Sequence, residues 1–491
     1  MVKNTPLIFE ISEKGRVGYS LPKPLYPEYS VDTLDFSLLR EELPNLPETS
    51  ELNVIRHFTN ISKLNFGVEN GFYPLGSCTM KYNPKINEEI ASMGIFNRLH
   101  PYQSVSSVQG VLKIYDELQR MLSNLSGLDE FSLNPYAGAH GELTGLMIMK
   151  KYHEDRQDFK RTKVLVPDSA HGTNPASATV CGLESVEIKS NIHGKVDLDS
   201  LKAALNDEIA GIMLTNPNTL GIFESDIAEI AKLVHEAGGL LYYDGANMNA
   251  LLGVSRPGDM GFDICHINLH KTFSTPHGGG GPGSGPVGVK KHLAHLLPNP
   301  RVKKQDEYFY IENSKEAIGQ ISSFFGNFKV WLRAYVYILT LGKENIVNVG
   351  PYAVLNANYV KERLKEDYLL PIKGFCMHEC VFDGLVDQST GVRTLDVAKR
   401  ILDFGMHAPT IYFPLLFHQS IMIEPTETES LLALNHFVDV MKKIAVEAKE
   451  NPDLVKSAPH TTPISRIDEV FAAKRMILTY KDYLDAQLDT E

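Results

Sequence analysis

Short apolar blocks alternate with helical spacing between residues 160 and 245. Strands are predicted at 163–167, 184–189, 211–215 and 240–244, and helices at 198–205 and 227–237. The second helix runs into Gly238 and Gly239, a common helix stop. Strands that alternate with helices predict parallel strands with helices on both faces of the sheet. In such sheets the ligand site lies at the carboxyl ends of the strands.

The regions on either side of this block differ from it. Proline and acidic residues recur over residues 1–60 among scattered Leu, Ile and Phe, which predicts an extended arm that wraps another subunit. Helices are predicted at 395–404 and 431–442, in a second α+β domain. A chain of 491 residues is too long for one core. We therefore expect an arm at 1–70, a large domain at 71–340 and a small C-terminal domain at 341–491.

Composition excludes several classes of protein. With 43% hydrophobic and 22% charged residues, the chain is typical of a globular protein, and its net charge of −12 argues against nucleic-acid binding. The N-terminus lacks a signal-peptide core, and no apolar run is long enough to predict a membrane span. The odd count of five cysteines favours reduced thiols and a cytoplasmic location. Cys376 and Cys380 lack C-x-x-C spacing, so no metal site is expected.

Small residues precede a helical run at 143–153. Backbone N–H groups at Gly138, Ala139 and His140 could therefore approach an anion, which the helix dipole would favour. The pattern predicts a phosphate cradle, and a simple capped loop is the alternative.

His171 follows the strand at 163–167, in a loop before the predicted N-cap Asn174 and first helical residue Pro175. Its imidazole could stack on a flat cofactor ring at the carboxyl end of that strand. A loop histidine hydrogen-bonded to water is the alternative.

Asp244 ends a buried strand, where a carboxylate is costly without a partner. A protonated ring nitrogen would be such a partner, and neighbouring amides are the alternative. Ala246 is small enough for a planar ring to lie against the backbone. Lys271 ends a predicted strand over 263–270, before a Gly-rich segment at 278–285. A lysine amine in such a place can form an imine with a carbonyl cofactor.

The order of these features is more specific than any one of them. A phosphate loop, a stacking residue, a strand-end aspartate and a lysine follow one another, with room for separate strand ends. An aspartate at the pyridinium nitrogen and an imine lysine are what proteins contribute to pyridoxal-5'-phosphate (PLP) chemistry. The sequence therefore predicts a PLP enzyme.

The chain resembles the fold-type I PLP enzymes and, more narrowly, the P-protein family of the glycine cleavage system, glycine dehydrogenase (decarboxylating). The resemblance implies a mainly parallel seven-stranded sheet in the large domain and a smaller C-terminal α+β domain. The matching motifs span roughly residues 50–445 and lie at 74–81, 138–142, 170–176, 243–249, 268–273, 407–410 and 422–427.

Single-chain members of this family are about twice as long, so the chain is similar to subunit 2 of the split form. That similarity implies a separate subunit 1, with two copies of each subunit. It also implies oxidative decarboxylation of glycine, with the aminomethyl group passed to the lipoyl arm of H-protein.

The resemblance also assigns roles to residues. Lys271 would bind PLP covalently, Asp244 would contact the ring nitrogen, and His171 would stack on the ring, these three being the catalytic residues. The other residues implied to contact the cofactor are Gly138, Ala139 and His140 at the phosphate, Asn216 and Thr219 at the ring's 3-oxygen, Ala246 behind the ring, and His270.

Some alternatives stay open. Thr79 and Lys81 are candidates to hold the glycine carboxylate or to form a structural turn. The Gly-rich segment could open to admit the lipoyl arm. The competing functions are another PLP decarboxylase, or a cysteine-desulfurase-like lyase, that needs no lipoyl carrier, and a non-catalytic partner subunit. A nucleotide-binding module is disfavoured because the segment lacks the G-x-x-x-x-G-K-[ST] pattern.

Overall fold

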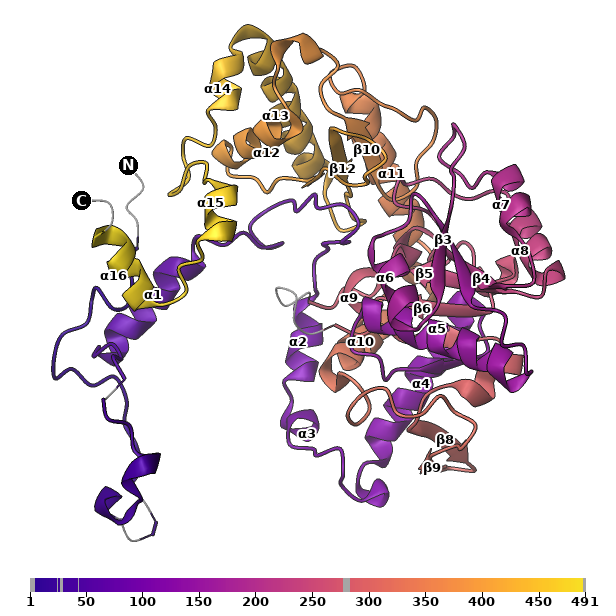
Figure 1. Cartoon of the computed structure of the whole chain (residues 1–491), viewed down its shortest axis with the longest axis horizontal. Helices are drawn as coiled ribbons and strands as arrows, with labels where there is room; N and C mark the ends of the chain where they lie inside the picture. The colour runs from indigo at the N-terminus through magenta and orange to yellow at the C-terminus, as the bar shows by residue number, and fades with distance from the viewer. Residues whose placement is uncertain (1–4, 24, 27–29, 43, 277–282, 489–491) are drawn as a thin grey trace. The chain divides into compact units, whose positions relative to one another are not determined.

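The computed structural model describes residues 5–23, 25–26, 30–42, 44–276 and 283–488. The chain forms two compact units, one of Met1–Asn70 with Ala458–Glu491 and one of Gly71–Ser457 (Figure 1). The boundary expected between residues 340 and 341 falls inside the larger unit and stays a prediction.

The larger unit is built on a seven-stranded sheet of order β1-β7-β6-β5-β4-β2-β3. Strands β3, β2, β4, β5 and β6 are parallel, whereas β7 runs antiparallel to β6 and to β1. The predicted mainly parallel, seven-stranded α/β fold is confirmed. The strands are β1 Glu130–Ser132, β2 Lys163–Pro167, β3 Glu184–Ile188, β4 Ile209–Thr215, β5 Leu240–Gly245, β6 Ile264–Ile267 and β7 Val287–Val289.

Both faces of this sheet are covered. Alternate side chains of β5 enter two different cores: Leu241 and Tyr243 join one, and Leu240 and Tyr242 join the other. This two-sided burial explains why central strands such as β4 and β5 are almost continuously apolar. The helices of this part are α2 Lys85–Ala91, α3 Gly94–Asn97, α4 Gln109–Ser126, α5 Gly138–Asp155, α6 Thr173–Val180, α7 Leu198–Ala204, α8 Ile227–Glu236, α9 Leu269–Thr272 and α10 Phe328–Ile346, with a hairpin of β8 Arg301–Gln305 and β9 Tyr308–Glu312.

The C-terminal part of the larger unit has its own core. An antiparallel sheet of order β10-β12-β11 packs with helices α11, α12 and α13, so this part is α+β as expected. Its elements are α11 Val349–Leu364, β10 Cys380–Asp383, α12 Thr394–Asp403, β11 Thr410–Ile411, β12 Ser420–Ile423, α13 Leu431–Glu450 and α14 Pro452–Lys456.

The smaller unit joins the two ends of the chain. The Phe9 and Tyr480 rings stack with centroids 4.5 Å apart. Helix α1 carries a stripe of Leu52, Ile55 and Phe58, each more than half exposed. Its helices are α1 Glu51–Ser62, α15 Glu469–Lys474 and α16 Tyr480–Leu488. Among all the described helices, none combines the length and apolar character needed to cross a bilayer.

Candidate functional site

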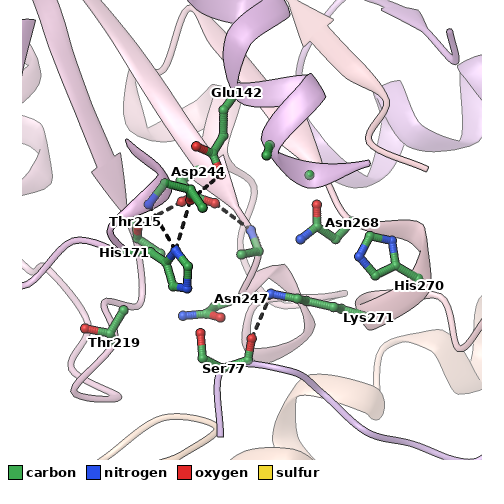
Figure 2. A pocket seen from close by; sticks show the side chains of 14 residues that line it. Ser77, Glu142, His171, Thr215, Thr219, Asp244, Asn247, Asn268, His270 and Lys271 are labelled. Carbon is green, nitrogen blue, oxygen red and sulfur yellow. Dashed lines mark hydrogen bonds between the residues drawn. The ribbon is translucent and has the colours of Figure 1, made fainter. Parts of the chain in front are cut away.

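A cavity of about 180 Å³ opens at the carboxyl ends of the parallel strands (Figure 2). It collects residues that follow β2, β4, β5 and β6, because parallel strands end at the same edge. Most of the predicted site residues line it, but His140 and Asn216 do not. The lining residues are Ser77, Gly138, Ala139, Glu142, His171, Thr173, Thr215, Thr219, Asp244, Ala246, Asn247, Asn268, His270 and Lys271.

Asp244 is the buried anion of this cavity, with a relative exposure of 2%. Its carboxylate accepts hydrogen bonds from the Asn174 amide at 3.0 Å and the Ala246 N–H at 3.0 Å. Nε2 of His266, on the neighbouring strand β6, lies 3.4 Å away. Burial raises the pKa of Asp244, but the His266 charge and these hydrogen bonds outweigh it and leave the pKa below its ordinary value. The carboxylate is therefore held in its charged form.

Lys271 lies in the helical turn α9 rather than at the end of a strand, because β6 stops at Ile267. Its ammonium donates a hydrogen bond of 2.7 Å to the Ser77 carbonyl (Figure 2). The amine therefore points across the cavity instead of into bulk solvent. Of the Gly-rich segment at 278–285, residues 278–282 lie outside the described part of the chain.

Helix α5 begins at Gly138, earlier than the helical pattern suggested, so the predicted cradle is its first turn. The N-cap residue Ala137 offers no side-chain cap to the free N–H groups of this turn. The His140 side chain turns away from the cavity, and its Nδ1 accepts the Tyr136 N–H at 3.2 Å. Burial lowers the pKa of His140, which favours the neutral imidazole. Its contribution to anion binding is thus limited to its backbone.

Position 138 requires glycine because the backbone there lies very close to the Asn268 side chain. A Cβ there would lie 2.5 Å from Oδ1 of Asn268, which is itself buried and without a hydrogen-bond partner in the described chain. We expect Gly138→Ala to displace Asn268 and to weaken PLP binding about 10- to 100-fold. This factor corresponds to the loss of one charge-assisted hydrogen bond between the first turn of α5 and the phosphate. Titration of the apoprotein, followed by visible absorbance, measures this. Gly110→Ala is the control, because no atom lies within 4 Å of that added Cβ. Unchanged affinity in Gly138→Ala would contradict the expectation.

His171 is exposed at the mouth of the cavity, and its Nδ1 lies 2.9 Å from the Thr173 hydroxyl. The Thr173 hydroxyl also reaches Glu142 at 2.8 Å, so two side chains orient the imidazole. The prediction that Asn174 caps the next helix is wrong. Helix α6 begins at Thr173, and the Asn174 amide instead donates to Asp244.

The side chains of Asn216 and Thr219 are engaged elsewhere. Oδ1 of Asn216 accepts the Glu224 N–H at 2.9 Å. The Thr219 hydroxyl lines the cavity but donates to the Ser169 carbonyl. Their assignment to the ring's 3-oxygen stays a prediction.

The residues of the cavity fit PLP. At one end the free N–H groups of the uncapped first turn of α5 suit a phosphate. At the other end the buried Asp244 suits a protonated ring nitrogen, and Lys271 supplies an amine between them.

Comparison with known sequences identifies the family. Residues 34–303 match the family described as "Glycine cleavage system P-protein", and residues 349–461 match "Glycine dehydrogenase, C-terminal domain". The chain belongs to the P-protein family. A curated relative from Caldanaerobacter subterraneus subsp. tengcongensis, "Probable glycine dehydrogenase (decarboxylating) subunit 2", is 60% identical over 96% of this chain and 98% of its own. The relative of the same name from Thermotoga maritima is 55% identical over 96% and 99%.

Solved structures share the fold. A P-protein structure, the glycine decarboxylase of the glycine cleavage system in inhibitor-bound form, has a TM-score of 0.71 at 21% identity, covering 84% of this chain and 94% of that one. A glutamate decarboxylase from Lactobacillus brevis has a TM-score of 0.65 at 12% identity, covering 86% and 97%. At these identities the likeness supports the fold alone.

In this P-protein family chain, Thr79 and Lys81 are structural. The Lys81 ammonium is buried and donates to Glu427 at 2.6 Å and to the Thr272 carbonyl at 2.7 Å, beside Lys271. Thr79 is bonded to Glu424. Neither lines the cavity, so the prediction that they hold the glycine carboxylate is not supported and the structural alternative is favoured.

Sequence reasoning missed several lining residues of the P-protein site. Asn268 and Asn247 had a usable signal, since each lies within three residues of a predicted site residue in a buried segment. Glu142, Thr173 and Thr215 had the same proximity to a predicted site residue. Ser77 had none, because it reaches the cavity only through the packing of separate elements.

Proposed function

We propose that this chain is the PLP-binding subunit 2 of a split glycine dehydrogenase (decarboxylating). It would decarboxylate glycine and pass the aminomethyl group to the lipoyl arm of H-protein. One observation carries the proposal: in a chain of the P-protein family, Lys271, Asp244 and the uncapped start of α5 surround one cavity.

PLP bound in this cavity would withdraw electrons from the bonds at the α-carbon of glycine. Asp244 keeps the ring nitrogen protonated, because its carboxylate is buried and charged. Glu142 and Thr173 hold the His171 imidazole at the cavity mouth, where it can lie against the ring and exclude water.

Lys271 is the residue that we propose to carry PLP covalently, through Nζ. With glycine bound, the free amine of Lys271 would be held on the Ser77 carbonyl, as it is in the structure. From there it would take up or return a proton at the substrate nitrogen.

The overall change is balanced by the lipoyl disulfide. The bond between the glycine α-carbon and its carboxyl group breaks, and CO₂ leaves. A new carbon–sulfur bond joins the aminomethyl group to one lipoyl sulfur, and the other sulfur leaves as a thiol after taking a proton. The disulfide is thus the oxidant of the reaction.

The partner implied by the relatives' names is a subunit 1. The exposed apolar stripe of Leu52, Ile55 and Phe58 on α1 supports a subunit contact, because such a helix face is ordinarily buried. We propose a complex with two copies of each subunit. A cytoplasmic location is proposed from the five free thiols.

The test is reconstitution. The chain, subunit 1 and lipoylated H-protein are expected together to release ¹⁴CO₂ from carboxyl-labelled glycine. H-protein without its lipoyl group is expected to support only a small fraction of that rate, because it lacks the acceptor disulfide. Equal rates with and without the lipoyl group would favour a decarboxylase that needs no carrier. No PLP uptake by the complete complex would favour a non-catalytic subunit.

A further inference from the structure

Three ionisable side chains lie behind the cavity with no exposed surface: His378, Glu379 and Glu424. One ligand-type atom from each lies within 4.8 Å of the others. They come from the C-terminal part of the larger unit and meet the segment of residues 77–79, far away in sequence. No residue of this cluster lines the cavity itself.

Three of the four carboxylate oxygens of the cluster accept hydrogen bonds among the described residues. Glu424 accepts the Thr79 N–H at 2.9 Å and the Thr79 hydroxyl at 2.6 Å. Oε2 of Glu379 accepts the Ser77 N–H at 2.8 Å. The fourth oxygen, Oε1 of Glu379, lies 3.3 Å from Nε2 of His378 and has no hydrogen bond among the described residues. The imidazole is therefore the group that faces the last open oxygen.

Two buried carboxylates need a compensating charge. Nε2 of His378 lies 3.3 Å from Oε1 of Glu379, in direct contact with it. Burial lowers the pKa of His378, yet the charges of Glu379 and Glu424 outweigh it and leave the pKa raised. Burial also raises the pKa of Glu424. The geometry thus places the His378 imidazole against Glu379 and within 4.8 Å of Glu424, where a positive charge would offset the two carboxylates.

The turn of residues 77–79, which the two glutamates hold by hydrogen bonds, has an unusual backbone conformation. Ser77 and Thr79 have φ values of 63° and 48°, in the left-handed region that residues with a Cβ seldom adopt. The Ser77 carbonyl, exposed by this conformation, receives the Lys271 ammonium at 2.7 Å. The glutamates hold the N–H groups of both strained residues, so they fix the direction of that carbonyl.

We propose that His378, Glu379 and Glu424 form a buried ion triad that positions the Ser77–Thr79 turn, and thereby the freed amine of Lys271. These are positioning residues, because they touch neither the cavity nor the reacting atoms. The inference rests on the proposed function, since the freed amine matters only if glycine displaces it. Loss of the triad should lower kcat for glycine decarboxylation more than it weakens the binding of PLP or of glycine.

The experiment uses the complete complex carrying Glu379→Gln or Glu424→Gln, which keep the shape and remove the charge. We expect PLP content and the borohydride-fixed adduct on the Lys271 peptide to stay close to wild type. We expect kcat for glycine decarboxylation to fall about 10- to 100-fold, the usual effect of losing a supporting contact, while KM for glycine changes less than about threefold. Glu429→Gln is the matched control, a half-buried glutamate of the same segment outside the triad.

A second pair of variants tests the same contact in case the glutamate variants do not fold. Thr79→Val removes the hydroxyl donor to Glu424, whereas Thr79→Ser retains it and is expected to recover most of the lost rate. Unchanged kcat in folded Glu379→Gln and Glu424→Gln would overturn the proposal. So would one bound metal ion per wild-type chain that is lost in Glu379→Gln, since a cation would then hold the cluster. A wild-type complex without PLP or activity would instead contradict the proposed function.

Discussion

Replacement of Lys271 by alanine is expected to reduce glycine decarboxylation by about 10³-fold or more, as removal of a covalent catalytic group commonly does. The amine of Lys271 faces the cavity and is held there by the Ser77 carbonyl. No other lysine lines that cavity, within the part of the chain that the structure describes, so none can take its place.

The measurement combines kcat with borohydride reduction and peptide mapping. Wild type should yield a PLP adduct on the peptide that contains Lys271, and Lys271→Ala should yield none. Lys232→Ala, at an exposed position of α8, is the control and should behave as wild type. Decarboxylation by Lys271→Ala at a near wild-type rate would defeat the assignment.

Replacement of Asp244 by asparagine is the second large effect that we expect. The side chain keeps its size but loses the charge that we propose holds a proton on the ring nitrogen. Because the pKa of Asp244 lies below its ordinary value, the wild-type carboxylate is charged throughout the neutral range. We expect kcat to fall about 10²- to 10³-fold, as when a preorganised electrostatic contact is removed.

PLP content and kcat should be measured together in Asp244→Asn. Bound PLP with low kcat is the expected result, because the substitution leaves unchanged the first turn of α5, where we propose that the phosphate binds. Asp259→Asn is the control, since that exposed carboxylate pairs with Arg256 on the surface. A kcat close to wild type would show that Asp244 is only a structural partner of Asn174 and His266.

The strands and the order of the chemistry were predictable because they depend on local patterns. Buried runs such as 163–167 and 240–244 have no polar interruption, so the parallel sheet followed directly. Asp244 was found because it stands at the end of such a run, whereas Lys271 was found from the chemistry of a lysine before a Gly-rich segment, although it lies in the turn α9 beyond the strand. Helix starts were less predictable: α5 begins at Gly138, where glycine and alanine conceal the helical pattern.

Polar residues with several possible partners were not predictable. Asn174 has the composition of an N-cap, but the buried charge of Asp244 takes its amide instead. The positive charge of Lys81 would suit the binding of a substrate carboxylate, but Lys81 already forms an ion pair with Glu427. In both cases the deciding partner lies at least 70 residues away, and no local pattern reports it.

The turn at Ser77–Thr79 also bears on how the protein is made. Its partners Glu379 and Glu424 follow it by 302 and 345 residues, so these contacts have a very high sequence separation. Closing such long loops is slow, and it cannot begin before the later residues leave the ribosome. The nascent chain thus carries Lys271, Asp244 and helix α5 well before the turn that faces the lysine can form its contacts. The turn is therefore expected to take its final form late, only after the segment that contains Glu424 has been synthesised.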